Sequence, residues 1–171
     1  ADRRTGAGLE LVDRRQLHPP GARGHRRRSR PPCSFFTLIF ATVAVMNIPV
    51  DLRYSSDHEW IRQDGNTVTI GITDFAQDSL GDVVFVEAAE AASVVTVGDS
   101  FTEVESTKSV SDIYAPVSGT IVAVNEKLDD TPELLNSDPY GEGWICSIEM
   151  SDPTQLEGLM DADGYRALTE G

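Results

Sequence analysis

The chain has 171 residues, with 14 basic and 28 acidic side chains and a formal net charge of −14. The charge is uneven: residues 1–45 contain nine Arg and three acidic residues, whereas residues 46–171 contain five basic and 25 acidic residues. A body this acidic is repelled by nucleic-acid phosphates and by anionic membrane surfaces, so residues 46–171 are not expected to bind either. Two Cys more than a hundred residues apart make neither a disulfide framework nor a cysteine-rich metal site.

Residues 1–45 are an Arg- and Pro-rich leader without the apolar periodicity of a folded segment. We interpret them as upstream sequence ahead of a natural start at Met46, and a targeting leader is the alternative. Residues 46–171 are then one domain of ordinary size. We expect it in the cytoplasm of a bacterium, and in a mitochondrion only if 1–45 is a genuine transit peptide.

The body carries short strand signals in close succession. Alternating or β-branched runs predict strands over residues 58–62, 67–72, 83–87, 94–97, 101–106, 110–115, 119–124 and 144–150. A capped helix is expected over 75–80, ended by Gly81, and another begins at 131–133. A C-terminal helical stretch from 151 carries apolar residues at helical spacing, and Gly164 is expected to interrupt it. These elements predict a mostly-β domain, a barrel or sandwich, with short helices at its edges.

The motifs of common enzyme classes are missing from the sequence. It contains no Gly-x-Gly-x-x-Gly, no P-loop and no His-Glu-x-x-His. The body has a single histidine, His58, and a single cysteine, Cys146, which reads as a small strand residue. An enzyme built from these parts lacks a nucleophile, a base and a cofactor cradle, so a carrier or binding protein is favoured.

Lys108 stands out because two runs of strand-like alternation meet beside it. Residues 101–106 and 110–114 predict the two arms of a hairpin with Lys108 at its exposed tip. It is one of two lysines in the chain. Two interpretations remain open on spacing alone: a handle that another enzyme modifies, or a solubilising lysine on a turn.

The identity of the residues around Lys108, and not only their spacing, is informative. The segment 104–119, Val-Glu-Ser-Thr-Lys-Ser-Val-Ser-Asp-Ile-Tyr-Ala-Pro-Val-Ser-Gly, resembles the lipoylation motif of the glycine cleavage system H-protein family. The resemblance spans about residues 50–170. It includes four further blocks in the family's order: His58-Glu59-Trp60, residues 71–77, residues 80–87, and Asn136 with residues 139–144.

The resemblance implies a barrel-sandwich hybrid fold with lipoate in amide linkage on Lys108. Such a protein is a carrier without catalytic activity of its own. It takes an aminomethyl group from the pyridoxal-phosphate-dependent glycine decarboxylase (P protein) and delivers it to the folate-dependent aminomethyltransferase (T protein). Dihydrolipoamide dehydrogenase (L protein) then reoxidises the lipoyl group, and a lipoyl-attaching enzyme is the remaining partner. No metal site is expected.

The family's loaded arm folds into a surface cleft, and the resemblance places three carboxylates of this chain there. Glu59 and Asp112 match acidic positions of the family, and Asp57 stands where serine is frequent. A cationic amine is stabilised by nearby carboxylates. His58 and Trp60 are expected to be packing residues, as is Trp144.

The sequence also bears on other classes of protein. A lipoyl domain of a 2-oxo acid dehydrogenase would lack the His58-Glu59-Trp60 and 139–144 blocks. A biotinyl carrier resembles Met-Lys-Met at its tip, whereas Thr107 and Ser109 flank Lys108. A relative that relays lipoyl groups to other complexes stays open, while an enzyme is disfavoured by the missing catalytic groups.

Overall fold

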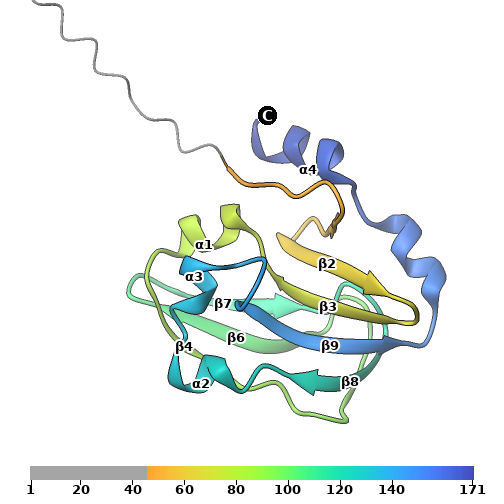
Figure 1. Cartoon of the computed structure of the whole chain (residues 1–171), viewed down its shortest axis with the longest axis horizontal. Helices are drawn as coiled ribbons and strands as arrows, with labels where there is room; N and C mark the ends of the chain where they lie inside the picture. The colour runs from red at the N-terminus through yellow and green to blue at the C-terminus, as the bar shows by residue number, and fades with distance from the viewer. Residues whose placement is uncertain (1–45) are drawn as a thin grey trace, which may run out of the picture. The chain divides into compact units, whose positions relative to one another are not determined.

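The computed structural model describes residues 46–171, so the leader expected over residues 1–45 lies outside the described residues. The described part contains a six-stranded antiparallel sheet, in the order β1-β2-β3-β9-β8-β5, and a three-stranded antiparallel sheet, β4-β6-β7 (Figure 1). The strands are β1 Arg53–Tyr54, β2 Glu59–Asp64, β3 Thr67–Ile72, β4 Val83–Val86, β5 Val94–Val95, β6 Ser100–Ser106, β7 Val110–Tyr114, β8 Gly119–Val124 and β9 Trp144–Met150. The mostly-β prediction is confirmed.

Short helices lie between and after the strands. They are α1 Asp74–Leu80, α2 Lys127–Asp130, α3 Leu134–Ser137, the 3₁₀ helix η1 Pro153–Gly158 and α4 Ala162–Thr169. Within residues 46–171, none of these helices has the length and apolar character needed to cross a membrane.

Two glycines with positive φ lie where the first elements end, and the second of them, Gly81, ends its helix as predicted. The β2–β3 hairpin turns at Gly65, whose φ is 61°. Helix α1 begins at the N-cap Thr73, whose side chain accepts a hydrogen bond from the Ala76 N–H, and it ends at Gly81, whose φ is 79°. Glycine meets no steric penalty in this region of backbone space. Only the N-cap Thr73 separates the end of β3 from the start of α1, and α1 borders the site described below.

The core lies between the two sheets. Alternate residues of the strands point inward, and the fully buried ones include Val68, Ile70, Val104, Ile121 and Ile148. Burying each such side chain contributes about 1.5–3 kcal/mol. The inward set leaves the opposite face of the three-stranded sheet to solvent.

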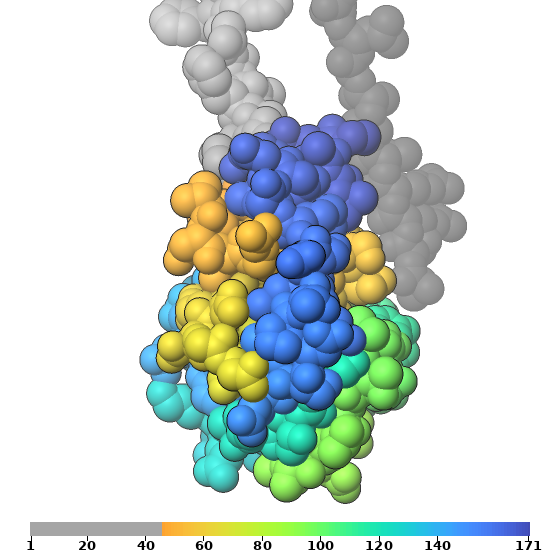
Figure 2. Space-filling view, turned by 90° about the vertical axis from the view of Figure 1, so that its right-hand side faces the viewer, coloured from red at the N-terminus to blue at the C-terminus, as the bar shows by residue number. Residues whose placement is uncertain are grey.

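A second cluster joins the first described residues to the C-terminal helix. Tyr54 and Tyr165 are fully buried and stack with ring centroids 4.6 Å apart. Trp60 lies against Gly71, where an added Cβ would come within 2.7 Å of the indole ring. Figure 2 shows the C-terminal segment in blue lying beside the orange residues that follow 46. Helix α4 is thereby attached to the strands that carry the site.

The C-terminal helical prediction is wrong in two respects. Residues 153–158 form a 3₁₀ helix, and Met160 then pairs with Tyr54 through two backbone hydrogen bonds of 2.9 Å, which require extended backbone. Gly164 does not interrupt α4 either. Its N–H donates to the capping carboxylate of Asp161 at 2.8 Å, so the glycine lies in the first turn of the helix. Tertiary pairing and capping, respectively, override the local signals.

Two smaller differences concern β5 and α2. Strand β5 ends at Val95, two residues short of its predicted end, because Val97 N–H donates to the Ser118 side chain rather than to a strand. Helix α2 was not predicted, and its N-cap Glu126 makes no side-chain capping bond that would have marked it.

In the loop before β5, Ala92 takes a φ of 65° and its N–H donates to the Ile121 carbonyl at 2.8 Å.

Candidate functional site

Lys108 lies exposed at the tip of the β6–β7 hairpin, as predicted. Ser106 organises this turn: its Oγ accepts from the N–H groups of Lys108 at 3.1 Å and Ser109 at 3.0 Å. The Ser106 N–H also donates to the Ser109 carbonyl at 2.8 Å. The backbone under Lys108 is therefore held by local hydrogen bonds while its side chain remains accessible.

The hairpin tip is also fixed to the loop that follows α1. The Thr107 N–H donates to the Asp82 carbonyl at 3.0 Å. A Cβ at Gly81 would lie 2.9 Å from Lys108 Nζ and 3.0 Å from its Cε. The lysine side chain therefore lies across Gly81, and both the φ of this position and the close contact favour glycine.

Asn136 on α3 holds that loop in place. Its Oδ1 accepts from the Val83 N–H, and its Nδ2 donates to the Gly81 carbonyl and to Gln77 Oε1, each at 2.9 Å. In Figure 1 the β6–β7 turn lies on the same side as α1 and α3. A chain of contacts thus runs from Asn136 through the loop to the turn that carries Lys108. The sequence contains Asn136 in a resembling block but does not reveal this role.

An open pocket of about 380 Å³ lies beside the hairpin tip. Its walls come from α1, from β7 and from the residues before β2, and they combine aliphatic and aromatic side chains with two carboxylates. The lining residues are Asp57, His58, Ile72, Phe75, Ala76, Ser79, Leu80, Ser109, Ser111, Asp112 and Ile113. Ser109 connects the pocket to Lys108, and Leu80 connects it to Gly81 in the chain. The pocket is therefore within reach of a group attached to Lys108 Nζ.

Asp57 and Asp112 place their carboxyl groups at this pocket. Both residues are exposed. Asp112 Oδ1 accepts from the Ser100 side chain at 3.1 Å, and Asp112 lies directly opposite Glu103 on β6. Like charges opposite each other in a sheet are destabilising, so this pairing costs some stability.

Glu59 is more deeply buried than Asp57 and Asp112, and it shares a pocket with Asp57 but not with Asp112. It is only 1% exposed, and it lines a second pocket of about 350 Å³ on the other side of Asp57. Its Oε1 accepts from the Tyr114 N–H at 3.1 Å, and its Oε2 accepts from the Ser55 hydroxyl. Burial raises the pKa of this carboxyl above its usual value, although these hydrogen bonds oppose the shift. The structure therefore brings two of the three carboxylates to the pocket beside Lys108.

His58 contributes to the pocket wall, which the sequence did not indicate. Its backbone takes a φ of 74°, its ring lies 4.5 Å from that of Phe75, and its Nδ1 is 2.9 Å from the Tyr165 hydroxyl. That hydroxyl also contacts Thr73 Oγ1 at 2.7 Å. Burial lowers the pKa of the imidazole, while the charge of Asp57 opposes this shift. The predicted packing role of His58 is confirmed, and α4 is thereby coupled to the pocket.

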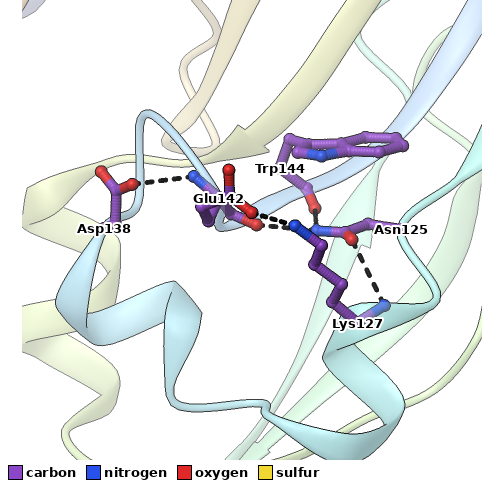
Figure 3. Close-up of polar contacts among 5 residues, drawn as sticks. All are labelled: Asn125, Lys127, Asp138, Glu142 and Trp144. Atoms are coloured by element: carbon purple, nitrogen blue, oxygen red, sulfur yellow. Dashed lines mark hydrogen bonds and ion pairs between the residues drawn. The ribbon is translucent and has the colours of Figure 1, made fainter.

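The block at 139–144 has a supporting role (Figure 3). Asn125 Nδ2 donates to the carbonyls of Glu142 and Trp144, each at 2.7 Å. The Glu142 N–H donates to Asp138 Oδ2 at 2.9 Å, and the Glu142 carboxylate pairs with Lys127. The loop in turn accepts from Trp60 Nε1 through the Pro139 carbonyl at 2.9 Å. The loop thereby helps to fix Trp60 on β2.

Nucleophilic and metal chemistry find no support in the described residues. Cys146 is fully buried, and burial raises the pKa of its thiol to about 12, so the thiol stays protonated at neutral pH. Across residues 46–171, no group of three or more His, Cys, Asp or Glu side chains could hold a metal ion. Cys146 is a buried residue of β9, as predicted.

Residues 52–171 match the family model described as glycine cleavage H-protein. The chain is 57% identical over 130 residues to a glycine cleavage system H protein of Mycobacterium avium (strain 104), covering 72% of this chain and 98% of that protein. It is 59% identical over 125 residues to the one of Micrococcus luteus, with the same coverage of 72% and 98%.

A crystal structure of a glycine cleavage system H protein from Mycobacterium marinum superposes with a TM-score of 0.67 at 42% identity. It covers 72% of this chain and 100% of that chain. The expected barrel-sandwich hybrid is confirmed by this likeness and by the two antiparallel sheets.

Proposed function

We propose that this chain, which belongs to the glycine cleavage H-protein family, carries lipoate in amide linkage on Lys108 Nζ. On this proposal it acts as a carrier without catalytic activity of its own. The observation that supports it most directly is an exposed lysine on a hydrogen-bonded turn, with a pocket of about 380 Å³ at its side.

The residues of the site fit a lipoyl group. Its short hydrocarbon chain and dithiolane ring are apolar, and the pocket offers apolar walls from Phe75, Leu80 and Ile113. A pocket of this volume falls within the range of small-molecule sites in proteins. Gly81 leaves room for the lysine stem that would carry the group. The amide bond would form at Nζ, the exposed end of that stem.

When attached, lipoate supplies a dithiolane that accepts the aminomethyl group from glycine decarboxylase, passes it to the folate-dependent aminomethyltransferase and is reoxidised by dihydrolipoamide dehydrogenase. The residues of this chain serve that exchange by position and charge. Lys108 provides the attachment point, and the Ser106 turn holds its backbone. The apolar pocket walls would contact the apolar part of the group, and the carboxylates of Asp57 and Asp112 attract an ammonium group.

The first experiment is the intact mass of the protein from its native host, with a peptide map around Lys108. We expect the mass of one lipoyl group in amide linkage on the peptide that contains Lys108, and none on the peptide that contains Lys127, whose amine pairs with Glu142. An unmodified Lys108 in cells whose other lipoyl proteins are modified would contradict the proposal.

A second experiment tests the pocket carboxylates. In Asp112→Asn, lipoylation should stay complete, while the carried aminomethyl group should be lost to hydrolysis several-fold faster because one attracting charge is gone. Asp130→Asn, which changes an exposed aspartate on α2 outside the pocket, is the matched control. Equal release from both variants would remove Asp112 from the proposal.

A further inference from the structure

Apolar side chains are exposed on the strand that borders the Lys108 hairpin. In β4, Val84 is 52% exposed and Phe85 is 49% exposed, although they are consecutive residues of a strand. The pairing register explains this, because Val83 lies opposite Ser106 and Phe85 opposite Glu105, so that Val84 is an extra residue. Such a bulge changes the direction of the side chains around it. Two consecutive apolar residues are thereby turned to solvent beside the hairpin.

The exposed residues form one row across the three-stranded sheet. Glu105 lies opposite Phe85 on one side and opposite Val110 on the other, and Val110 is 57% exposed. Since neighbouring strands are about 4.8 Å apart, Phe85 and Val110 lie roughly 10 Å from each other with Glu105 between them. We call Val84, Phe85 and Val110 the tip patch. Val110 lies two residues after Lys108, and Phe85 pairs with Glu105, which lies three residues before Lys108.

Acidic side chains surround the tip patch. Asp82, Glu103 and Glu105 are exposed on the same sheet or on the loop that leads into it. Glu103 lies opposite Asp112, a like-charge pair that costs stability. An apolar row within an acidic surround is complementary to a partner surface that is apolar at its centre and carries Lys and Arg around it.

One exposed apolar residue of the described chain lies well away from this row. Val94 is 79% exposed, but it shares a surface hollow with Ser100 at the far end of the hairpin. Seven residues of β6 separate that end from the tip, about 20 Å along the strand. Val94 is therefore a matched exposed valine that a partner bound at the tip would not cover.

We propose that the tip patch is the docking surface for the enzyme that attaches lipoate to Lys108, and that this enzyme binds it with an apolar surface edged by basic residues. The inference rests on the proposed function. Of the partners named, the attaching enzyme must bring its catalytic groups to Nζ itself, because the new bond forms there. The others meet only the far end of the attached group. The surface next to Lys108 is thus covered in the attachment complex.

The step is an acyl transfer. The uncharged Lys108 amine attacks the carbonyl carbon of an activated lipoyl donor, an acyl adenylate, and the C–N bond forms as the bond from that carbon to the phosphate oxygen breaks. Adenosine monophosphate leaves, and the amine loses one proton to a base of the enzyme or to water. The tip patch takes no part in this chemistry; its contribution is to productive binding.

The test is a time course of lipoylation of the unmodified protein, followed by intact mass with purified attaching enzyme and lipoyl adenylate. Phe85→Ser and Val110→Ser should each lower kcat/KM about tenfold, the effect expected for truncating an interface anchor. Val94→Ser should match the parent. The parent reaction should also slow as ionic strength rises, because the charged surroundings are screened.

The outcomes separate the two proposals. If the parent is not modified on Lys108, the proposed function fails. If the parent is modified and the tip variants react at the parental rate, the docking inference alone fails, and it also fails if Val94→Ser slows the reaction equally. Thermal unfolding of the variants serves as the check on folding. We expect each variant to have the melting temperature of the parent, because Phe85, Val110 and Val94 are 49%, 57% and 79% exposed.

Discussion

The turn around Lys108 and the segment from His58 to Trp60 border the same pocket region but are built differently. The turn is exposed and is held by its own backbone and Ser106, with one bond to Asp82. The other segment is largely buried and is held by side chains from distant parts of the chain: Glu59 by Tyr114, Trp60 by Pro139. Residues that present chemistry can therefore be supported locally, whereas residues that shape a pocket depend on the whole fold.

That difference predicts separable losses. Changes at the turn should affect attachment and leave stability intact, whereas changes at the buried segment should lower stability first. Four substitutions, in order of decreasing expected effect, test this separation.

Lys108→Arg should abolish lipoylation completely and leave the unfolding midpoint unchanged, because arginine keeps the charge and exposure but is not an acyl acceptor. Intact mass and thermal unfolding measure the two effects. Lys127→Arg alters the other lysine, which pairs with Glu142, and should be lipoylated like the parent. Residual modification of Lys108→Arg would show that a different residue accepts the group.

Glu59→Ala should lower the free energy of unfolding by about 3 kcal/mol. The substitution leaves the Tyr114 N–H without its acceptor and opens a cavity at a fully buried position. Urea unfolding measures the loss, and lipoylation of the folded fraction should remain complete. A variant of parental stability would show that Glu59 does not support the β1–β2 segment.

Gly81→Ala should lower stability by about 2 kcal/mol and slow lipoylation. Its φ of 79° and ψ of −151° are accessible to glycine alone, and the new Cβ would lie 2.9 Å from Lys108 Nζ. Gly65→Ala is the matched control: its φ of 61° is also positive, but a Cβ there meets nothing within 4 Å. It should cost about 1 kcal/mol and leave lipoylation unaffected. Equal lipoylation rates would mean that the contact with Lys108 is unimportant.

His58→Asn tests the pH dependence of the buried segment. Burial lowers the pKa of His58 below 6.5, so the folded protein binds its proton less tightly than the unfolded chain does. The stabilisation is present above pH 6.5 and is lost as the pH falls through the folded-state pKa. The stability difference between parent and variant should shrink between about pH 8 and about pH 5 in urea unfolding. Asparagine tolerates the positive φ, so a constant difference would exclude titration of His58 as the cause.

Much of the sheet framework follows from the sequence. Strands β8 and β9 occupy their predicted ranges, because β-branched and apolar residues fill them and glycine lies at or just before their first residue. Helix α1 follows from Thr73 and Gly81, since capping acts within one turn. Lys108 at a hairpin tip follows in the same way, from two alternating runs and a short connection.

The rest depends on contacts between distant residues. The extended backbone of Met160 follows from pairing with Tyr54, more than a hundred residues earlier, and local spacing contains no sign of it. The bulge at Val84 depends on register with β6, so its exposure could not be read from an apolar run. For the same reason the burial of Glu59 against Tyr114 could not be predicted from local sequence. It places Glu59 in a pocket that it shares with Asp57 but not with Asp112.

The ordered turn beneath Lys108 also has a thermodynamic consequence. Because Ser106 fixes the backbone at the proposed attachment point, a group on Nζ would explore only a small volume that includes the neighbouring pocket. A short tether of this kind gives an effective concentration in the millimolar range at the pocket. An intrinsic dissociation constant below about 1 mM then suffices to keep the group sequestered, a binding free energy of only about −4 kcal/mol. A partner enzyme can outcompete a hold that weak, so protection and rapid release are compatible in one small domain.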